Sequence, residues 1–230
     1  GLGDVYKRQA YVAENLGLPF AGSFESVRIL QNKDLFRRFL AENGFNVPCS
    51  GSYSEFDEAK KDADRFRFPV IVKPTDSAGS KGVTRVDNQE NLKQAFDHAL
   101  DNSISGHVII EEFIEKQGCS SDSDCFSLDG ELKVVTFSAQ RFDDEAANPY
   151  TPSAYSWPST FTETQKNYLA GELQRLVTLL NLKTSIYNIE TRIGSDGTPY
   201  IMEVSPRGGG NRLACLLYTS PSPRDPKTSR

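Results

Sequence analysis

Two glutamates near the end of the sequence, Glu190 and Glu203, are spaced so that both carboxylates could bind one cation. Two β-prone runs, residues 184–193 and 198–204, flank the dipeptide Asp196-Gly197, and this pattern predicts a hairpin. An Asp-Gly dipeptide favours the two central positions of a type I′ turn. With that turn, Glu190 lies directly opposite Glu203 in the predicted sheet.

The same register places Asn188 opposite Ser205, one pair further along the same face. Like charges directly opposite each other destabilise a sheet by up to about 1 kcal/mol, so the pairing of Glu190 with Glu203 needs a reason. A divalent cation bound by both carboxylates supplies one, and Mg²⁺ prefers such hard oxygen ligands. Two solvated glutamates on an exposed face, or a different register, are the alternatives.

A second candidate site combines lysines with a glycine-bearing loop. Lys73 ends a buried strand predicted over residues 69–73, and the sequence DSAGSKG follows at residues 76–82. Glycines let backbone N–H groups approach phosphate oxygens closely, while Lys73 and Lys81 add positive charge. The loop matches neither the GxxxxGK[ST] phosphate loop nor the GxGxxG fingerprint. Taken alone it is a weak signal, because most Gly/Ser loops are simply turns, and Lys33 alone would be assigned to a solvent-facing position.

The first half of the chain alternates strands with helices. A helix is predicted from Asn32 to Asn43, with Asn32 as its N-cap and Gly44 just past its end. Three strands are predicted around the glycine-bearing loop and after it, over residues 69–73, 83–86 and 107–113.

The second half is richer in hairpins. Asp129-Gly130 joins two β-prone runs by a two-residue turn, and residues 142–161 form a long irregular stretch. Thr162 and Gln165 begin a helix with apolar residues on one side. The predicted fold class is α+β, in two subdomains that meet near Glu111.

Composition narrows the class of protein. The chain has 230 residues and a formal net charge of −5, with 37% hydrophobic and 25% charged residues. These values are typical of a globular protein with a real core, and an acidic balance argues against a general nucleic-acid or anionic-membrane binder. No run approaches the ~18 apolar residues of a membrane span. The four cysteines show no metal-ligand spacing and are expected to be cytosolic thiols.

The two ends do not match the middle. The last thirteen residues, YTSPSPRDPKTSR, contain three prolines and no apolar periodicity, and the opening GLGDVYKRQ is similarly unanchored. Both ends resemble translated adaptor sequence. We therefore expect residues 1–9 to be non-native or disordered and residues 214–230 to form a disordered, non-native tail, in a truncated reading frame. A genuine flexible tail is the alternative.

Four runs together resemble the ATP-grasp superfamily in order and spacing. They are FPVIVKPTDSAGSKGV, VIIEEFIE, IYNIETR and YIMEVSPRGGGNRL, and the resemblance extends over about residues 11–213. It implies an ATP-grasp fold, in which two α+β subdomains clasp ATP between antiparallel sheets. The implied division is a remnant of a preceding domain over residues 10–30, then subdomain A over 31–110 and subdomain B over 111–213.

The resemblance also implies roles for individual residues. Lys33 and Lys73 match the lysines that reach the nucleotide phosphates, and a flexible loop closes over those phosphates. The loop residues are Gly79, Ser80, Lys81 and Gly82, and the adenine-recognising hinge residues are Glu111, Glu112, Phe113 and Ile114.

Four residues of the last hairpin complete the implied site. Glu190 and Glu203 match the glutamates that hold Mg²⁺, or Mn²⁺ in its place, in agreement with the predicted hairpin register. Ser205 stands where many members have a metal-binding asparagine, and is a shorter ligand. Arg207 matches the arginine that stabilises charge on the acyl phosphate and its tetrahedral adduct.

The implied function is an ATP- and Mg²⁺-dependent ligase that activates a carboxylate as an acyl phosphate for attack by an amine or thiol. Two alternatives stay open: a carboxylase or carbamoyl-phosphate-type subunit that activates bicarbonate, and a non-catalytic nucleotide-binding domain. The expected partners are small-molecule carboxylates and amines, with neither nucleic acid nor membrane, in the cytoplasm. A homodimer of the full-length protein is left open, and the fragment itself is expected to be a poor catalyst.

Overall fold

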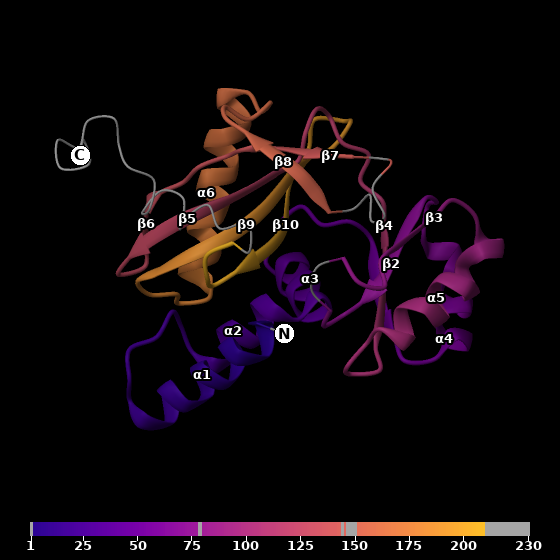
Figure 1. Cartoon of the computed structure of the whole chain (residues 1–230), viewed down its shortest axis with the longest axis horizontal. Helices are drawn as coiled ribbons and strands as arrows, with labels where there is room; N and C mark the ends of the chain where they lie inside the picture. The colour runs from indigo at the N-terminus through magenta and orange to yellow at the C-terminus, as the bar shows by residue number, and fades with distance from the viewer. Residues whose placement is uncertain (1, 78–79, 144, 146–150, 210–230) are drawn as a thin grey trace, which may run out of the picture.

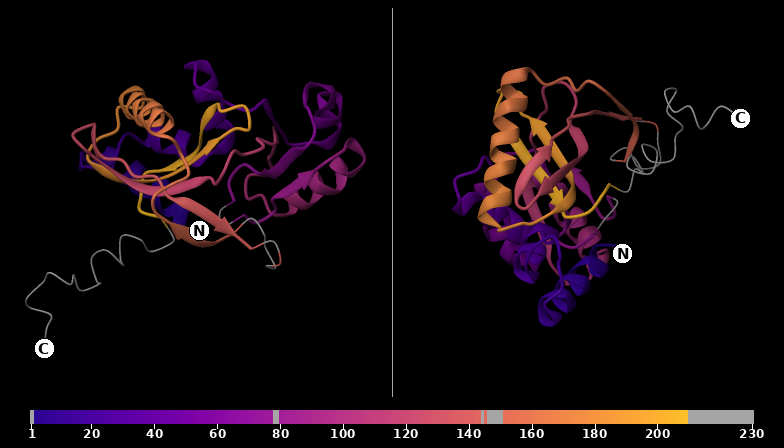
Figure 2. Two further views of the ribbon diagram at one scale, coloured as in Figure 1. Left: turned by 90° about the horizontal axis from the view of Figure 1, so that it is seen from above. Right: turned by 90° about the vertical axis from the view of Figure 1, so that its left-hand side faces the viewer.

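Two four-stranded antiparallel sheets form the two lobes of the protein, in a computed structural model that describes residues 2–77, 80–143, 145 and 151–209 (Figures 1 and 2). The first sheet contains, in spatial order, β1 (Ser50–Tyr53), β4 (Val108–Glu112), β2 (Val70–Pro74) and β3 (Thr84–Val86). The second contains β10 (Pro199–Ser205), β9 (Ser185–Ile193), β5 (Ser121–Leu128) and β6 (Glu131–Val134). A smaller sheet pairs β7 (Ala139–Phe142) with β8 (Pro152–Ser156).

Helices cover the first sheet on its far side from the second lobe (Figure 1). These are α4 (Phe56–Lys61) and α5 (Leu92–Asp101), each next to a short 3₁₀ turn. Val70 and Val72 of β2 are fully buried, and Phe96 of α5 belongs to the same apolar cluster. Lys73, which follows Val72, is only partly buried, because successive strand residues face opposite sides of the sheet.

The second sheet packs one face on α6 (Glu163–Leu179), which Figure 2 shows lying along the sheet. Tyr187 and Ile189 of β9 are buried in a cluster with Leu169 and Leu173 of α6. The even-numbered residues of β9 face the other way. That second face is the one that carries Glu190.

Two helices before the first sheet belong to the core of the second sheet. Leu30 of α2 (Phe24–Gln31), together with Phe36 and Leu40 of α3 (Lys33–Glu42), lies in the cluster that contains α6. The packing therefore differs from the predicted division of residues 31–110 from 111–213. A boundary at 110/111 would also cut β4, all of which belongs to the first sheet.

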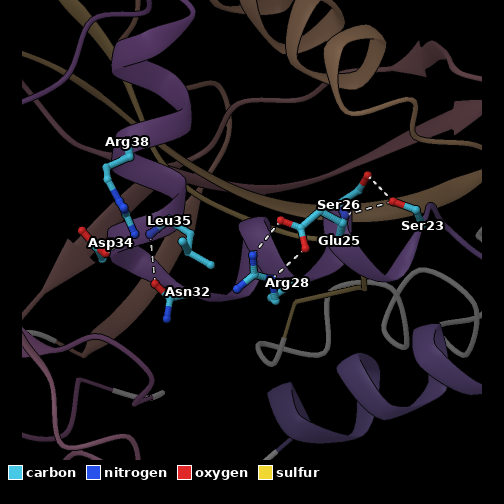
Figure 3. Close-up of polar contacts among 8 residues, drawn as sticks. All are labelled: Ser23, Glu25, Ser26, Arg28, Asn32, Asp34, Leu35 and Arg38. Carbon is cyan, nitrogen blue, oxygen red and sulfur yellow. Dashed lines mark hydrogen bonds and ion pairs between the residues drawn. The ribbon is translucent and has the colours of Figure 1, made fainter.

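The start of α3 is fixed as the sequence predicts (Figure 3). The side chain of Asn32 accepts a hydrogen bond from the backbone N–H of Leu35 at 2.9 Å. Gly44 follows the end of the helix with a φ of +71°, the left-handed conformation that glycine adopts easily. Because both ends of α3 are fixed, the positions of its side chains along the helix axis, between the two sheets, are fixed as well.

The predicted starts of the later elements are also confirmed. Thr162 and Gln165 form the reciprocal capping box of α6. Asp129 and Gly130 both have positive φ, as a two-residue type I′ turn requires, and they join β5 to β6.

Residues 2–9, which the sequence analysis expected to be disordered, form the first half of α1 (Leu2–Leu16). Aromatic contacts attach this helix to the chain that follows: the Tyr6 ring lies 6.3 Å from Phe20, and Tyr11 lies 5.6 Å from Phe24. The opening segment, expected to be unanchored, is therefore part of a helix. The expectations for residues 214–230 lie outside the described residues.

The stretch expected to be irregular, residues 142–161, includes the end of β7 and all of β8.

Among the helices that the structure describes, none is both long enough and apolar enough to cross a membrane.

Candidate functional site

The predicted carboxylate pair is present in the sheet. Glu203 lies opposite Glu190, and Ser205 lies opposite Asn188. The turn that leads to this register differs from the prediction. Gly194 pairs with Thr198 through a 2.8 Å hydrogen bond, so three residues form the loop.

A β-bulge restores the predicted register. Near the turn, Ile201 opposes Thr191, but the next pair is Glu203 with Glu190, and Met202 is the extra residue. The longer turn and the bulge therefore compensate. Without the bulge, Glu203 would lie opposite Ile189, whose side chain is in the apolar core.

The face around Glu190 concentrates negative charge. Its side chain is 34% exposed, and Arg192 is the nearest ion-pair partner, at 3.8 Å. Burial raises the pKa of Glu190, and the carboxylates of Glu203 and Asp122 raise it further, against the opposing effects of Arg192 and Lys73. A bound cation would relieve this repulsion.

Two aspartates of β5, which the sequence analysis did not select, lie on the same face. Asp122 opposes Glu190 and Asp124 opposes Asn188. Asp122 accepts hydrogen bonds from Asn188 at 2.5 Å and from the Tyr155 hydroxyl at 3.1 Å. Burial raises the pKa of Asp122 despite these bonds, and nearby Asp124 and Glu203 act in the same direction.

Asp124 holds the segment that leaves β10. Its Oδ1 accepts a hydrogen bond from the backbone N–H of Gly209 at 2.8 Å, while its Oδ2 is buried without a hydrogen-bond partner among the described residues. The alternation Ser-Asp-Ser-Asp at residues 121–124 is the sequence signal that could have identified both aspartates.

Lys73 lies in a buried ionic cluster on the first sheet. Its ammonium group contacts Glu111 of β4, and Arg37 of α3 donates to the same carboxylate at 3.1 Å. The side chains of Arg37 and Glu111 are 4% exposed and that of Lys73 is 14% exposed. Burial lowers the pKa of Lys73, and the positive charges of Arg37 and Lys33 add to this effect.

Glu111, expected to flank the adenine, is therefore paired with the side chains of Arg37 and Lys73. Burial by itself would raise the pKa of Glu111, but Arg37 and Lys73 together lower it to about 2. Its carboxylate is ionised and has little freedom to turn. The described contacts make it the residue that orients Lys73.

Lys33 reaches the glycine-bearing loop. Its ammonium group donates to the Ser77 carbonyl at 2.7 Å, and the Ser77 hydroxyl donates to the Lys81 carbonyl at 2.9 Å. Ser80 and Gly82 both have positive φ, and Lys81 between them is exposed. Gly79 lies outside the described residues.

The predicted hinge connects the lobes after β4. The Glu112 carboxylate pairs with Arg67 at 3.1 Å, on the opposite face of the sheet from Glu111. The Phe113 ring packs under the guanidinium of Arg85, at 4.5 Å from its centroid. The Ile114 carbonyl accepts a hydrogen bond from Arg192 at 3.2 Å.

Arg207 lies just beyond β10. One terminal nitrogen donates to the Gly208 carbonyl at 2.8 Å, and its backbone N–H donates to the Ser205 carbonyl at 2.8 Å. Its Nε is buried and has no hydrogen-bond partner among the described residues. Such a donor suits an anionic ligand.

The donor set on the second sheet fits a hard divalent cation. Facing carboxylate oxygens and the hydroxyl of Ser205 are the ligand types that Mg²⁺ prefers, and Asp122 adds a further carboxylate opposite Glu190. In the described part of the chain, no group of three or more His, Cys, Asp or Glu side chains is arranged to hold a metal alone. Phosphate oxygens and water would complete the coordination, as is usual for Mg²⁺.

Cationic and anionic residues from the two sheets thus meet between the lobes. Lys73 of the first sheet is close enough to Glu190 of the second to oppose the rise of its pKa. A polyphosphate with a divalent cation would match lysines on one side and carboxylates on the other.

Comparisons with known proteins identify the family and the fold. The ATP-grasp domain family model matches residues 66–215. Among curated proteins, the carbamoyl phosphate synthase large chain of Caldanaerobacter subterraneus subsp. tengcongensis is 25% identical over 191 residues, in a match that covers 80% of this chain and 17% of the relative. The C-terminal section of that large chain in Aquifex aeolicus is 26% identical over 190 residues, covering 80% of this chain and 33% of the relative.

Solved structures give the same fold. The L-amino acid ligase from Bacillus licheniformis superposes with a TM-score of 0.72 and 25% identity, over 89% of this chain and 47% of that protein. The VanG D-Ala:D-Ser ligase from Enterococcus faecalis superposes with a TM-score of 0.73 and 19% identity, over 86% of this chain and 59% of that protein. The chain thus spans only part of the proteins it resembles, and it belongs to the ATP-grasp family.

Proposed function

We propose that this chain binds ATP with Mg²⁺ between its two sheets and activates a carboxylate as an acyl phosphate. The observation that carries the proposal is the placement of opposite charges on two sheets that Arg37 connects, with Lys73 on one sheet and Glu190 facing Glu203 on the other. Phosphoryl transfer needs mainly positioning and charge neutralisation, and both are available there without a protein nucleophile.

Each of these residues would have its own role in binding the nucleotide and the metal. Lys33 and Lys73 would bind phosphate oxygens, and the backbone of residues 79–82 would cover them. The hinge of residues 111–114 would hold the adenine through its backbone, with Glu111 acting on Lys73. Bound Mg²⁺, held by Glu190, Glu203 and Ser205, would neutralise phosphate charge, and Mn²⁺ would serve in its place.

The proposed reaction has two steps. A carboxylate oxygen attacks the γ-phosphorus, the bond to the bridging oxygen of ADP breaks, and an acyl phosphate forms. An amine nitrogen or thiol sulfur then attacks the carbonyl carbon, loses a proton and expels inorganic phosphate. Arg207 would stabilise the negative charge on the acyl phosphate and its tetrahedral adduct.

Activation of bicarbonate is a second candidate for the carboxylate. It is favoured by the curated relatives, which are carbamoyl phosphate synthase large chains. A solved relative at 17% identity is a biotin carboxylase domain bound to MgADP and bicarbonate. That likeness supports the fold and leaves the substrate of this chain to experiment.

Hydroxylamine trapping tests both candidates. The full chain is incubated with ATP, Mg²⁺, hydroxylamine and a panel of amino acids, and hydroxamate is measured alongside ADP. Amino-acid-dependent hydroxamate supports the ligase, whereas ADP release that requires bicarbonate supports the second candidate. A chain that binds MgATP but gives neither product would contradict carboxylate activation by this chain and favour a nucleotide-binding domain.

Location and assembly remain proposals. We expect a cytoplasmic protein that acts on small molecules without nucleic acid or membrane, and whose full-length form is able to dimerise. One solved relative is described as a dimer of its biotin carboxylase domain.

A further inference from the structure

Arg37 is a buried cation that contacts both sheets. Its Nε donates to Glu111 of the first sheet at 3.1 Å, and its Nη1 donates to the backbone carbonyl of Met202 in the second sheet at 2.8 Å. The side chain is 4% exposed. A buried guanidinium needs such partners, and its planar fork can donate in two directions at once.

The Met202 carbonyl lies at the bulge of β10. Met202 is the residue that interrupts the regular pairing between Ile201 and Glu203. A bulged residue is left out of the sheet pairing, so its carbonyl needs another donor. Arg37 is that donor, and the bulge is what places Glu203 opposite Glu190 rather than over the core.

The same guanidinium is linked through Glu111 to Lys73 of the first sheet. Glu111 lies between Arg37 and Lys73, so a shift of Arg37 would move the carboxylate that orients the lysine. Lys33, one helical turn earlier on α3, contacts the glycine-bearing loop through Ser77. One helix therefore connects the loop, the strand lysine and the bulge.

We propose that Arg37 is a positioning residue that holds the β10 bulge, and with it Glu203, in register with Lys73. Its effect on nucleotide binding rests on the proposed function, whereas its effect on the bulge does not. A role limited to neutralising Glu111 is distinguishable, because Lys73 already pairs with Glu111, whereas Arg37 is the side chain that donates to the Met202 carbonyl.

Two substitutions separate these roles. Arg37→Met removes the charge and both bonds. Arg37→Lys keeps a charge for Glu111, but an ammonium group lacks the fork that spans two acceptors. The control is Arg175→Met, because Arg175 also pairs with a carboxylate, Glu172 at 2.6 Å, and donates to a backbone carbonyl, that of Asn43 at 2.7 Å.

Hydrogen exchange of the ligand-free full chain tests the bulge. Arg37→Met and Arg37→Lys are expected to speed exchange at the amides of residues 201–204 by about tenfold, with α5 unchanged. The Arg175→Met variant is expected to leave these amides as in the wild type. If Arg37→Met fails to fold, Arg37→Lys decides. Wild-type exchange at residues 201–204 in the folded variants would overturn the proposal.

Nucleotide binding gives the second readout. In both Arg37 variants, the factor by which Mg²⁺ tightens ATP binding is expected to fall about tenfold, while ATP affinity in EDTA changes less than twofold for Arg37→Lys. An unchanged Mg²⁺ factor in both would overturn the positioning role. Absence of ATP binding by the wild type would instead contradict the proposed function, and hydrogen exchange would then decide the role of Arg37 by itself.

Discussion

Glu111 and Glu190 are carboxylates on the sheets of different lobes. The charges that surround them have opposite signs. Arg37 and Lys73 enclose Glu111, and its pKa is lowered to about 2 in spite of its burial. Glu190 faces Glu203 and Asp122, and its pKa is raised by burial and by those charges. The protein itself neutralises the first carboxylate and leaves the second under-compensated.

This difference separates a structural carboxylate from a ligand-binding one. A buried ion whose partners are all protein groups holds other residues in place, and removing either partner is costly. A cluster of like charges destabilises the empty protein and gains from a cation. On this contrast we propose that Glu111 organises the site and that Glu190 binds the metal.

The largest expected effect is on stability. Glu111→Ala leaves Arg37 and Lys73 buried without their carboxylate, and should lower the free energy of unfolding by about 3–5 kcal/mol. Denaturant unfolding measures this loss. Glu112→Ala on the same strand removes the pair with exposed Arg67 and should cost about 1 kcal/mol or less. Equal losses of unfolding free energy in the two variants would contradict the distinction between the buried ionic cluster and the exposed ion pair.

A smaller effect with opposite signs is expected at the carboxylate pair. Glu203→Ala should weaken Mg²⁺-dependent ATP binding at least tenfold, because one metal ligand is lost. The same change should stabilise the ligand-free protein by up to about 1 kcal/mol, because like charges no longer face each other. Calorimetry and unfolding measure the two effects, with Glu131→Ala on the edge strand as control. A variant that loses both stability and affinity would contradict the assignment.

The two carboxylates should also respond oppositely to pH. Because the folded-state pKa of Glu111 is lowered, its contribution to stability is present above its ordinary pKa of 4.5 and is lost as pH falls toward 2. The folded-state pKa of Glu190 is raised, so its contribution is greatest below 4.5 and declines as pH rises above that value. Unfolding free energies of Glu111→Gln and Glu190→Gln across pH 2–8 test both slopes. Parallel curves for the two variants would be inconsistent with the contrast.

The smallest effect concerns a neighbour. Asp122→Asn removes one of the charges that raise the pKa of Glu190, so that pKa should fall. A carboxyl titration followed by NMR measures the change. A rise in the Glu190 pKa would show that the hydrogen bonds of Asp122 outweigh its charge.

Much of the fold and part of the site could be predicted from the sequence. Caps such as Asn32 and turns such as Asp129-Gly130 act locally, so their residue types were enough. The pairing of Glu190 with Glu203 was predicted correctly from an incorrect turn, because the bulge at Met202 offset the longer loop. Arg37, far away in the sequence, contacts that bulge, and hairpin rules do not include such a partner.

The residues whose roles the sequence did not reveal were missed for one physical reason. Helical periodicity assigns charged residues to solvent, so Arg37 was overlooked although it is buried between the sheets. The role of Glu111 depends on partners 38 and 74 positions away in the chain. Such contacts follow from the tertiary arrangement and from no local pattern.

The most direct test of the central claim is a calorimetric titration of ATP into the full chain, in Mg²⁺ and in EDTA, for the wild type and for Glu190→Gln. Saturable binding that Mg²⁺ strengthens in the wild type, and no longer strengthens in Glu190→Gln, is the predicted result. Binding that is absent, or that Mg²⁺ strengthens equally in both proteins, would contradict the assignment of Glu190 and Glu203 as the metal site.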